Sequence, residues 1–204
     1  MKKVCDHWQQ AFPAGIFGPH LFAEFETRAK SVGAEVMRVA TAAEAQGVLV
    51  ELAKSLGAKK VVAVDCPLAT AAGAYEALRV AGLEVYTTQT DIAHHASTAD
   101  LGVSGVEFGV AETASVLQDA QAIESRLVST LPPVHAVFMS SNNILPAMAD
   151  AIGVVAQVYD RGYLSFITGP SRTADIERVL TIGVHGPSRF IIIAVDETAE
   201  GGGE

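Results

Sequence analysis

The sequence predicts an α/β fold: a three-layer α/β/α sandwich in which a mostly parallel sheet lies between two layers of helices. Short apolar runs alternate with helical patterns through the first half of the chain, and the links between them are short. Such alternation is typical of parallel strands joined by right-handed helical crossovers. Half of the 204 residues are hydrophobic, which is enough for one core, so we expect a single domain over residues 1–204.

The first half of the chain has the clearest elements. Thr41 and Glu44 have the spacing of a capping box at a helix start, and the β-branched run 61–64 is typical of a strand buried on both faces. The expected strands are 36–39, 61–64 and 83–88, and the expected helices are 19–32, 41–57 and 68–81.

The second half is less regular, and its boundaries are softer. Residues 106–117 are rich in strand patterns, and Asn142 or Asn143 is expected to start a helix. The expected strands are 134–139, 163–168 and 190–195, and the expected helices are 144–152 and 174–180, the second behind a tight loop at 169–173. We expect residues 1–18 to form an N-terminal extension and residues 198–204 a flexible tail.

Composition excludes several classes of protein. The chain has 14 Lys+Arg against 23 Asp+Glu, a formal charge of -9, and no basic run, so nucleic acid is not an expected partner. Its longest apolar runs, such as 190–195, are far shorter than a membrane span, and the N-terminus lacks the apolar core of a signal peptide. We therefore expect a cytoplasmic protein with no membrane partner.

The sequence contains no pattern for a cofactor of its own. The two cysteines, Cys5 and Cys66, are far apart, and the adjacent pair His94 and His95 would point to opposite faces of a strand, so we predict no metal site. The glycine-rich fingerprints for ATP and NAD and the serine motif of α/β-hydrolases are missing as well.

The loop at 169–173 is the first candidate site. A strand that feeds a glycine-containing turn into a helix start directs free N–H groups at one point, where anions bind. Arg172 would add a bidentate donor, and Ser171 and Thr173 would add hydroxyls. In the alternative, Thr173 only caps the helix and Arg172 pairs with Asp175 or Glu177.

Two further residues are candidates for proton transfer. Glu112 lies in an apolar surround and would be a general base or nucleophile if it lines a pocket, whereas in the alternative it faces solvent or pairs with an arginine. His185, in a loop bounded by glycine and proline, would act as acid or base, or would be a hydrogen-bonded structural histidine, and His135 has the same alternatives. The candidate catalytic residues are Glu112, Arg172 and His185, and the candidate ligand-binding residues are Gly105, Thr113, Thr168, Gly169, Ser171, Thr173 and Asp175.

Five separated motifs, which lie in one order along the second half of the chain, resemble the LUD domain of the lactate-utilisation protein C family. They are residues 98–105, 111–113, 131–135, 167–177 and 183–187. The family commonly continues Ala-Glu-Thr with Gly-Thr, but here Ala114 and Ser115 follow. The methyl group of Ala114 would narrow any close approach of a ligand and would remove the freedom of glycine at positive φ.

The resemblance implies a fold of the superfamily that contains ribose-5-phosphate isomerase, glucosamine-6-phosphate deaminase and the CoA-transferases. It also implies a part in oxidising L-lactate to pyruvate beside partner subunits that carry iron–sulfur clusters, with no cofactor in this chain. Two other functions stay open, because one fold hosts many chemistries. One is a stand-alone enzyme that acts on a small phosphorylated or CoA-linked metabolite through Glu112 and Arg172, and the other is a non-catalytic assembly or regulatory subunit.

Overall fold

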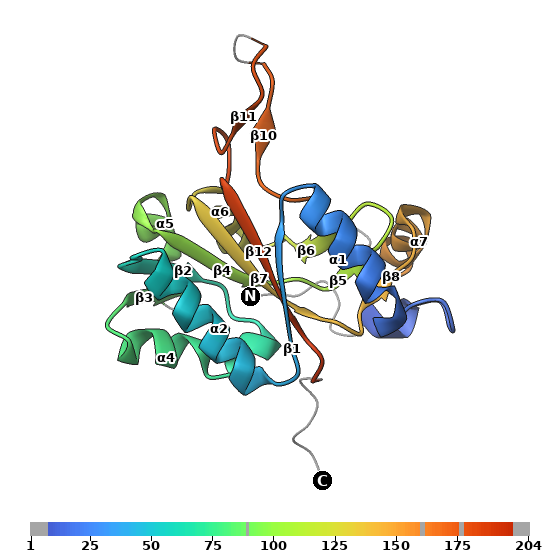
Figure 1. Ribbon diagram of the computed structural model, residues 1–204, viewed down its shortest axis with the longest axis horizontal. Coiled ribbons are helices and arrows are strands. Elements are labelled where there is room, and N and C mark those ends of the chain that lie inside the picture. The colour runs from blue at the N-terminus through green and yellow to red at the C-terminus, as the bar shows by residue number, and fades with distance from the viewer. Residues whose placement is uncertain (1–7, 89, 160–161, 176–177, 198–204) are drawn as a thin grey trace.

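A parallel sheet of six strands forms the centre of the protein (Figure 1). The computed structural model describes residues 8–88, 90–159, 162–175 and 178–197. The strands follow the order β1-β12-β7-β4-β2-β3, and each neighbouring pair is parallel. Their bounds are β1 Glu35–Val39, β2 Lys60–Ala63, β3 Glu84–Thr87, β4 Leu101–Gly105, β7 Val134–Ser140 and β12 Arg189–Val195. The predicted parallel α/β architecture is confirmed.

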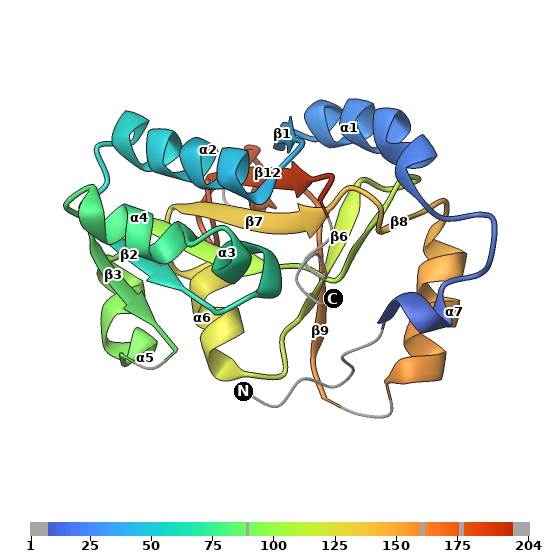
Figure 2. The ribbon, with the colours of Figure 1, turned by 90° about the horizontal axis from the view of Figure 1, so that it is seen from below.

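Each face of the central sheet has its own cover, because successive side chains of a strand point to opposite faces. Val61 and Ile191 pack on one face against α2, α3 and α4. On the other face Val62 packs against α5 and α6, while Ile192 packs against α1. Figure 2 shows α2 and α6 on opposite sides of β7. The helices are α1 Phe22–Ser31, α2 Ala42–Ser55, α3 Pro67–Ala71, α4 Ala74–Val80, α5 Ile92–His95, α6 Ile123–Thr130 and α7 Met148–Val158, with 3-10 turns at Trp8–Ala11, Pro19–Leu21 and Ala96–Thr98.

A second sheet of four strands, in the order β8-β5-β6-β9, lies beside the central one. One of its faces packs on α1, and the other packs on α7 and the turn Trp8–Ala11. Trp8 is buried against Phe108, so the described part of the expected N-terminal extension belongs to this core. The bounds are β5 Phe108–Val110, β6 Ser115–Asp119, β8 Ile144–Leu145 and β9 Leu164–Ile167. Strands were expected in these segments, apart from β8, but not as a separate sheet.

Two expected helices differ from the structure in their bounds. The helix expected over 68–81 is divided into α3 and α4, because Gly73 adopts the left-handed conformation with φ +59°. The helix expected over 144–152 begins only at Met148, because Ile144–Leu145 pairs with β5 as a strand. Neither asparagine caps it, and Glu112 and Asp150 accept the N–H groups at its start instead.

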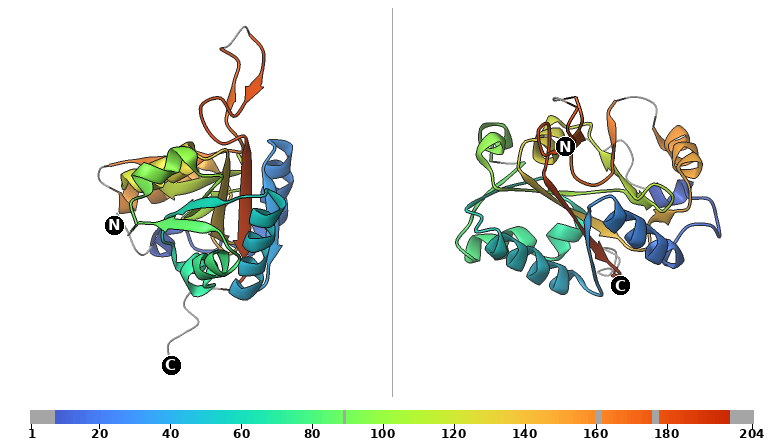
Figure 3. Two further views of the ribbon diagram at one scale, coloured as in Figure 1. Left: turned by 90° about the vertical axis from the view of Figure 1, so that its left-hand side faces the viewer. Right: turned by 45° about the horizontal axis from the view of Figure 1, so that its top comes forward.

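The prediction of a helix over 174–180 is wrong for the part of that segment that the structure describes. Arg172–Thr173 (β10) and Thr181–Ile182 (β11) form an antiparallel pair, and the pair projects from the body (Figures 1 and 3). A helix here would have no core on which to bury an apolar face, whereas a hairpin satisfies its backbone groups across the pair. Residues 176–177, and the tail expected at 198–204, lie outside the described residues. In the described ranges, no helix is long and apolar enough to cross a bilayer.

Candidate functional site

A chain of hydroxyl groups joins two motifs that are far apart in the sequence. The Thr113 hydroxyl donates to Ser115 Oγ at 2.9 Å, and Ser115 Oγ lies 2.6 Å from Thr168 Oγ1. The antiparallel pairing of β6 with β9 produces this contact, because it places Val116 opposite Ile167. The hydroxyl chain brings Thr113 and Thr168 together, and we call Glu112, Thr113, Ser115, Thr168 and Arg172 the β6–β9 rim.

Helix α1 holds both ends of this rim. Arg28 on α1 donates to the backbone carbonyl of Glu112 at 2.5 Å, and Arg172 donates to the backbone carbonyl of Val32, just past the end of the helix. The last carbonyls of a helix have no partner within the helix, so a guanidinium is a favourable cap there. Arg172 is nevertheless exposed, and a guanidinium has five N–H donors.

Glu112 does not lie in the apolar pocket that its neighbours suggested. Its side chain is exposed, and Oε2 accepts the N–H of Met148 at 2.8 Å. A carboxylate at this place satisfies one orphan donor of α7 and interacts favourably with the positive end of the helix. The geometry therefore gives Glu112 a capping role that the sequence did not suggest.

The loop at 169–173 lacks the geometry that was expected to bind an anion. No helix start follows it in the described residues, and the Thr173 hydroxyl accepts the N–H of Asp175 at 3.3 Å in a turn. Gly169 has φ +68°, and a Cβ there would lie 2.7 Å from the carbonyl oxygen of Val32. The glycine thus permits close packing on the end of α1. The strand before the loop, β9, belongs to the second sheet and not to the central one.

The remaining candidates fall in two places. Ser171 exchanges backbone hydrogen bonds with the loop 183–187, in which His185 is exposed, at the start of β12. Gly105 lies far from them at the other end of the central sheet, where β4 ends. A Cβ at Gly105 would be 2.6 Å from Cys66 Cβ, so the residue is required for packing.

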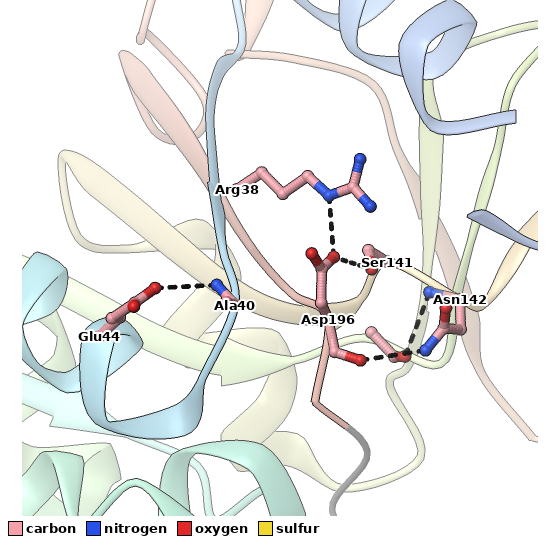
Figure 4. A network of polar contacts seen from close by, with 7 residues as sticks. Arg38, Ala40, Glu44, Ser141, Asn142 and Asp196 are labelled. Atoms are coloured by element: carbon pink, nitrogen blue, oxygen red, sulfur yellow. Dashed lines mark hydrogen bonds and ion pairs between the residues drawn. The ribbon is translucent and has the colours of Figure 1, made fainter. Parts of the chain in front are cut away.

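The sequence reasoning missed a polar network at the carboxyl ends of β1, β7 and β12 (Figure 4). The Asp196 carboxylate accepts from the Ser141 hydroxyl at 2.5 Å and from Arg38 Nε at 2.8 Å, and the Asn142 amide donates to the Asp196 carbonyl. Burial raises the pKa of Asp196, but the donors on Ser141 and Arg38 outweigh burial and hold this pKa below its usual value. The polar residues that follow the apolar runs 134–139 and 190–195 were a partial signal, because ligands of open α/β sheets gather at strand ends, but Arg38 lies within its strand and gave none.

A second polar cluster is buried between the two sheets. The Ser104 hydroxyl on β4 lies 2.9 Å from His135 Nε2 on β7 and accepts from the Gln118 amide on β6 at 3.0 Å. Burial lowers the pKa of His135 to about 3, and its Nδ1 has no hydrogen-bond partner. The imidazole is enclosed, so the structure places it as a structural histidine, one of the two alternatives for this residue.

Two shallow cavities lie away from the rim. One, of about 420 Å³, is bounded by Asp65, Tyr75 and Arg79 near the ends of β2 and β3, and the other, of about 360 Å³, by Phe12 and Val154. No rim residue lines either of them. Among the residues that the structure describes, no three His, Cys, Asp or Glu side chains are grouped closely enough to hold a metal ion.

The chain is similar to proteins associated with lactate use. The LUD domain family model matches residues 22–195. The lactate utilization protein C of Deinococcus radiodurans is 29% identical over 186 residues, which cover 90% of this chain and 83% of that protein. The protein of the same name from Bacillus velezensis is 35% identical over 107 residues, 50% of this chain and 44% of its own length. In this and other such matches the chain spans less than half the length of the curated relative.

A solved structure shows the same fold. The crystal structure of a DUF162 family protein from Deinococcus radiodurans has a TM-score of 0.62 and 24% identity, and the match covers 86% of this chain and 96% of that one.

Proposed function

The chain belongs to the LUD domain family, and we propose that it is a component of a cytoplasmic system that oxidises L-lactate to pyruvate. The alignment with the Deinococcus lactate utilization protein C supports this role, because it extends over 90% of the chain. The five motifs that suggested the family fall within the matched residues 22–195.

In this proposal, the β6–β9 rim binds the small carboxylate. The single observation that carries it is the hydroxyl chain in which Ser115 links Thr113 to Thr168, at 2.9 and 2.6 Å, because it brings two of the motifs together. Thr168 is exposed at the end of the hydroxyl chain, and Arg172 carries the donors that a planar carboxylate accepts. A 2-hydroxy or 2-oxo acid presents both a carboxylate and a second oxygen, which suits a hydroxyl beside a guanidinium.

Electron transfer from lactate belongs, in this proposal, to partner subunits with iron–sulfur clusters. The family resemblance is the support for these partners. The rim would then present the substrate, or dock the redox partner, without doing redox chemistry itself.

The stand-alone enzyme has less support. It needs the Glu112 carboxylate as a nucleophile or base, but Oε2 of this residue accepts the N–H of Met148 at the start of α7. The non-catalytic assembly subunit is compatible with the same geometry, and it differs from the first proposal in binding no lactate or pyruvate.

Growth and binding measurements test the proposal together. We expect a deletion strain with no second copy of the gene to fail on L-lactate, and the wild-type gene to restore growth. Thr168→Val removes one rim hydroxyl at constant shape and should weaken both growth and the binding of lactate or pyruvate in calorimetry. Thr130→Val, at the exposed last position of α6, is the matched control and should behave as wild type. Normal growth of the deletion strain would refute the lactate role, and growth without ligand binding would favour the assembly subunit.

A further inference from the structure

The hairpin of β10 and β11 projects from the body of the protein (Figure 3). We call residues 172–175 and 178–184 the arm. Its two strands share only the residue pairs Arg172 with Ile182 and Thr173 with Thr181. A ribbon of two strands is marginally stable in water without further packing. The body of the chain holds the base of the arm through the Arg172 bond to Val32, but the apolar residues farther along the arm stay exposed.

The arm carries apolar side chains that face solvent. Val179 is 60% exposed, Leu180 65% and Ile182 50%, and Val184 at its base is exposed as well. Single exposed apolar residues are ordinary on a protein surface, but a group of them on one projection is typical of an interaction site.

The same chain also offers a receptor for the arm. Strand β9 is last in the order β8-β5-β6-β9, so the edge that faces away from β6 has no strand beside it in the described residues. Tyr163 and Phe166, next to and on this strand, are exposed. Open strand edges pair with strands of other chains. A projecting ribbon and an open apolar edge on one molecule give the self-complementarity that a two-fold dimer requires.

We propose that the arm docks on a second copy of this chain, along the open edge of β9, and that two such contacts form a two-fold dimer. Because β9 leads directly to Thr168, the arm of each copy would lie beside the β6–β9 rim of the other. Each rim would then be completed by arm residues of the partner copy. The dimer does not depend on the lactate role, and its test measures mass and not activity.

Sedimentation and light scattering of the full chain test the dimer. We expect a mass of twice 21.3 kDa at high concentration and dissociation on dilution. The double variant Val179→Asp with Leu180→Asp should have the mass of one chain, because it places charges in the contact. Val80→Asp is the matched control, since Val80 is 81% exposed on α4 and remote from the arm, and it should stay dimeric.

Circular dichroism of each variant establishes that it is folded. A wild-type mass of one chain at every concentration would overturn the proposal and would leave the arm for a different protein. An unchanged mass of the arm variant would overturn it equally. Phe166→Asp should also yield single chains, and a dimeric Phe166→Asp would overturn the assignment of β9 as the receptor.

Discussion

The carboxyl edge of the central sheet and the β6–β9 rim use their polar groups differently. At the carboxyl edge, the Asp196 carboxylate accepts from both Ser141 and Arg38, which links the ends of β12, β7 and β1. At the rim, the hydroxyl chain ends at the exposed Thr168, and Arg172 also faces solvent. Polar residues at the ends of parallel strands are therefore not sufficient to indicate a site, because their hydrogen bonds can be satisfied within the protein.

The two regions also differ in the sheet to which they belong. The carboxyl edge follows β1, β7 and β12 of the central sheet, whereas the rim depends on the pairing of β6 with β9 in the second sheet. The family motif at 111–113 and the described residues 167–175 of another motif thus lie on an accessory sheet and its arm. Variants can therefore separate the contacts that stabilise the packing of the two sheets from the residues that bind ligand at the rim.

The largest expected effect concerns His135, which lies between the two sheets. The pKa of this residue is about 3 in the folded protein and near 6.5 in the unfolded chain, so the unfolded state takes up the proton first. The contribution of neutral His135 to the free energy of unfolding is fully present above about pH 6.5. This contribution is lost as the pH falls towards 3, by about 1.4 kcal/mol per pH unit. Urea unfolding between about pH 7 and pH 4 should show a steeper decline for wild type than for His135→Gln. Parallel curves for the two proteins would refute this origin of acid sensitivity.

The second largest effect is expected at Gly105 on the carboxyl edge. Gly105→Ala would place a methyl group 2.6 Å from Cys66 Cβ and should cost about 2–3 kcal/mol of unfolding free energy. Gly47→Ala is the control, because nothing lies within 4 Å of its Cβ and alanine favours helix α2, so that variant should gain up to about 1 kcal/mol. If Gly105→Ala were as stable as wild type, the glycine would not be needed for packing, and its assignment to a ligand would regain support.

Most strands of the central sheet could be predicted from local sequence patterns, but β4, with Gly102 and Gly105 in it, was missed. Runs such as 61–64 and 190–195 are apolar throughout, and the helices between them have one apolar face, as Phe22, Phe25 and Ala29 show on α1. The second sheet could not be assembled in this way, since β8 has only the residues Ile144 and Leu145 and its partner β5 is distant in the sequence.

The failures at the candidate site have a similar cause. Thr173 followed by Asp175 looks the same in a sequence whether it begins a helix or closes a turn, and only tertiary packing decides between them. The network at the carboxyl edge joins Arg38 to Asp196, which are 158 residues apart, so no local spacing indicates it.

A moderate loss of stability is expected when the central hydrogen-bond acceptor of the network at the carboxyl edge is removed. Asp196→Ala removes the acceptor for Ser141 and Arg38 and should cost about 1–2 kcal/mol, a value reduced by the exposure of the carboxylate. Lactate binding at the rim should not change. Glu51→Ala breaks the exposed pair with Lys54 and is the control, with an expected change below about 0.5 kcal/mol. A loss of ligand binding in Asp196→Ala with stability intact would move the site to the carboxyl edge.

The smallest effect is expected at Ala114, where family members commonly have glycine. Ala114 has φ +55°, and relieving this left-handed alanine should gain about 1–2 kcal/mol in Ala114→Gly. Two terms oppose the gain: the methyl is fully buried and contributes about 0.8 kcal/mol, and glycine adds about 0.4–1 kcal/mol of freedom to the unfolded chain. These terms nearly cancel, so urea unfolding should show a change within about 0.5 kcal/mol. A large gain would mean that the methyl strains the rim next to Thr113, and a large loss would mean that its packing between α1 and the second sheet determines the residue.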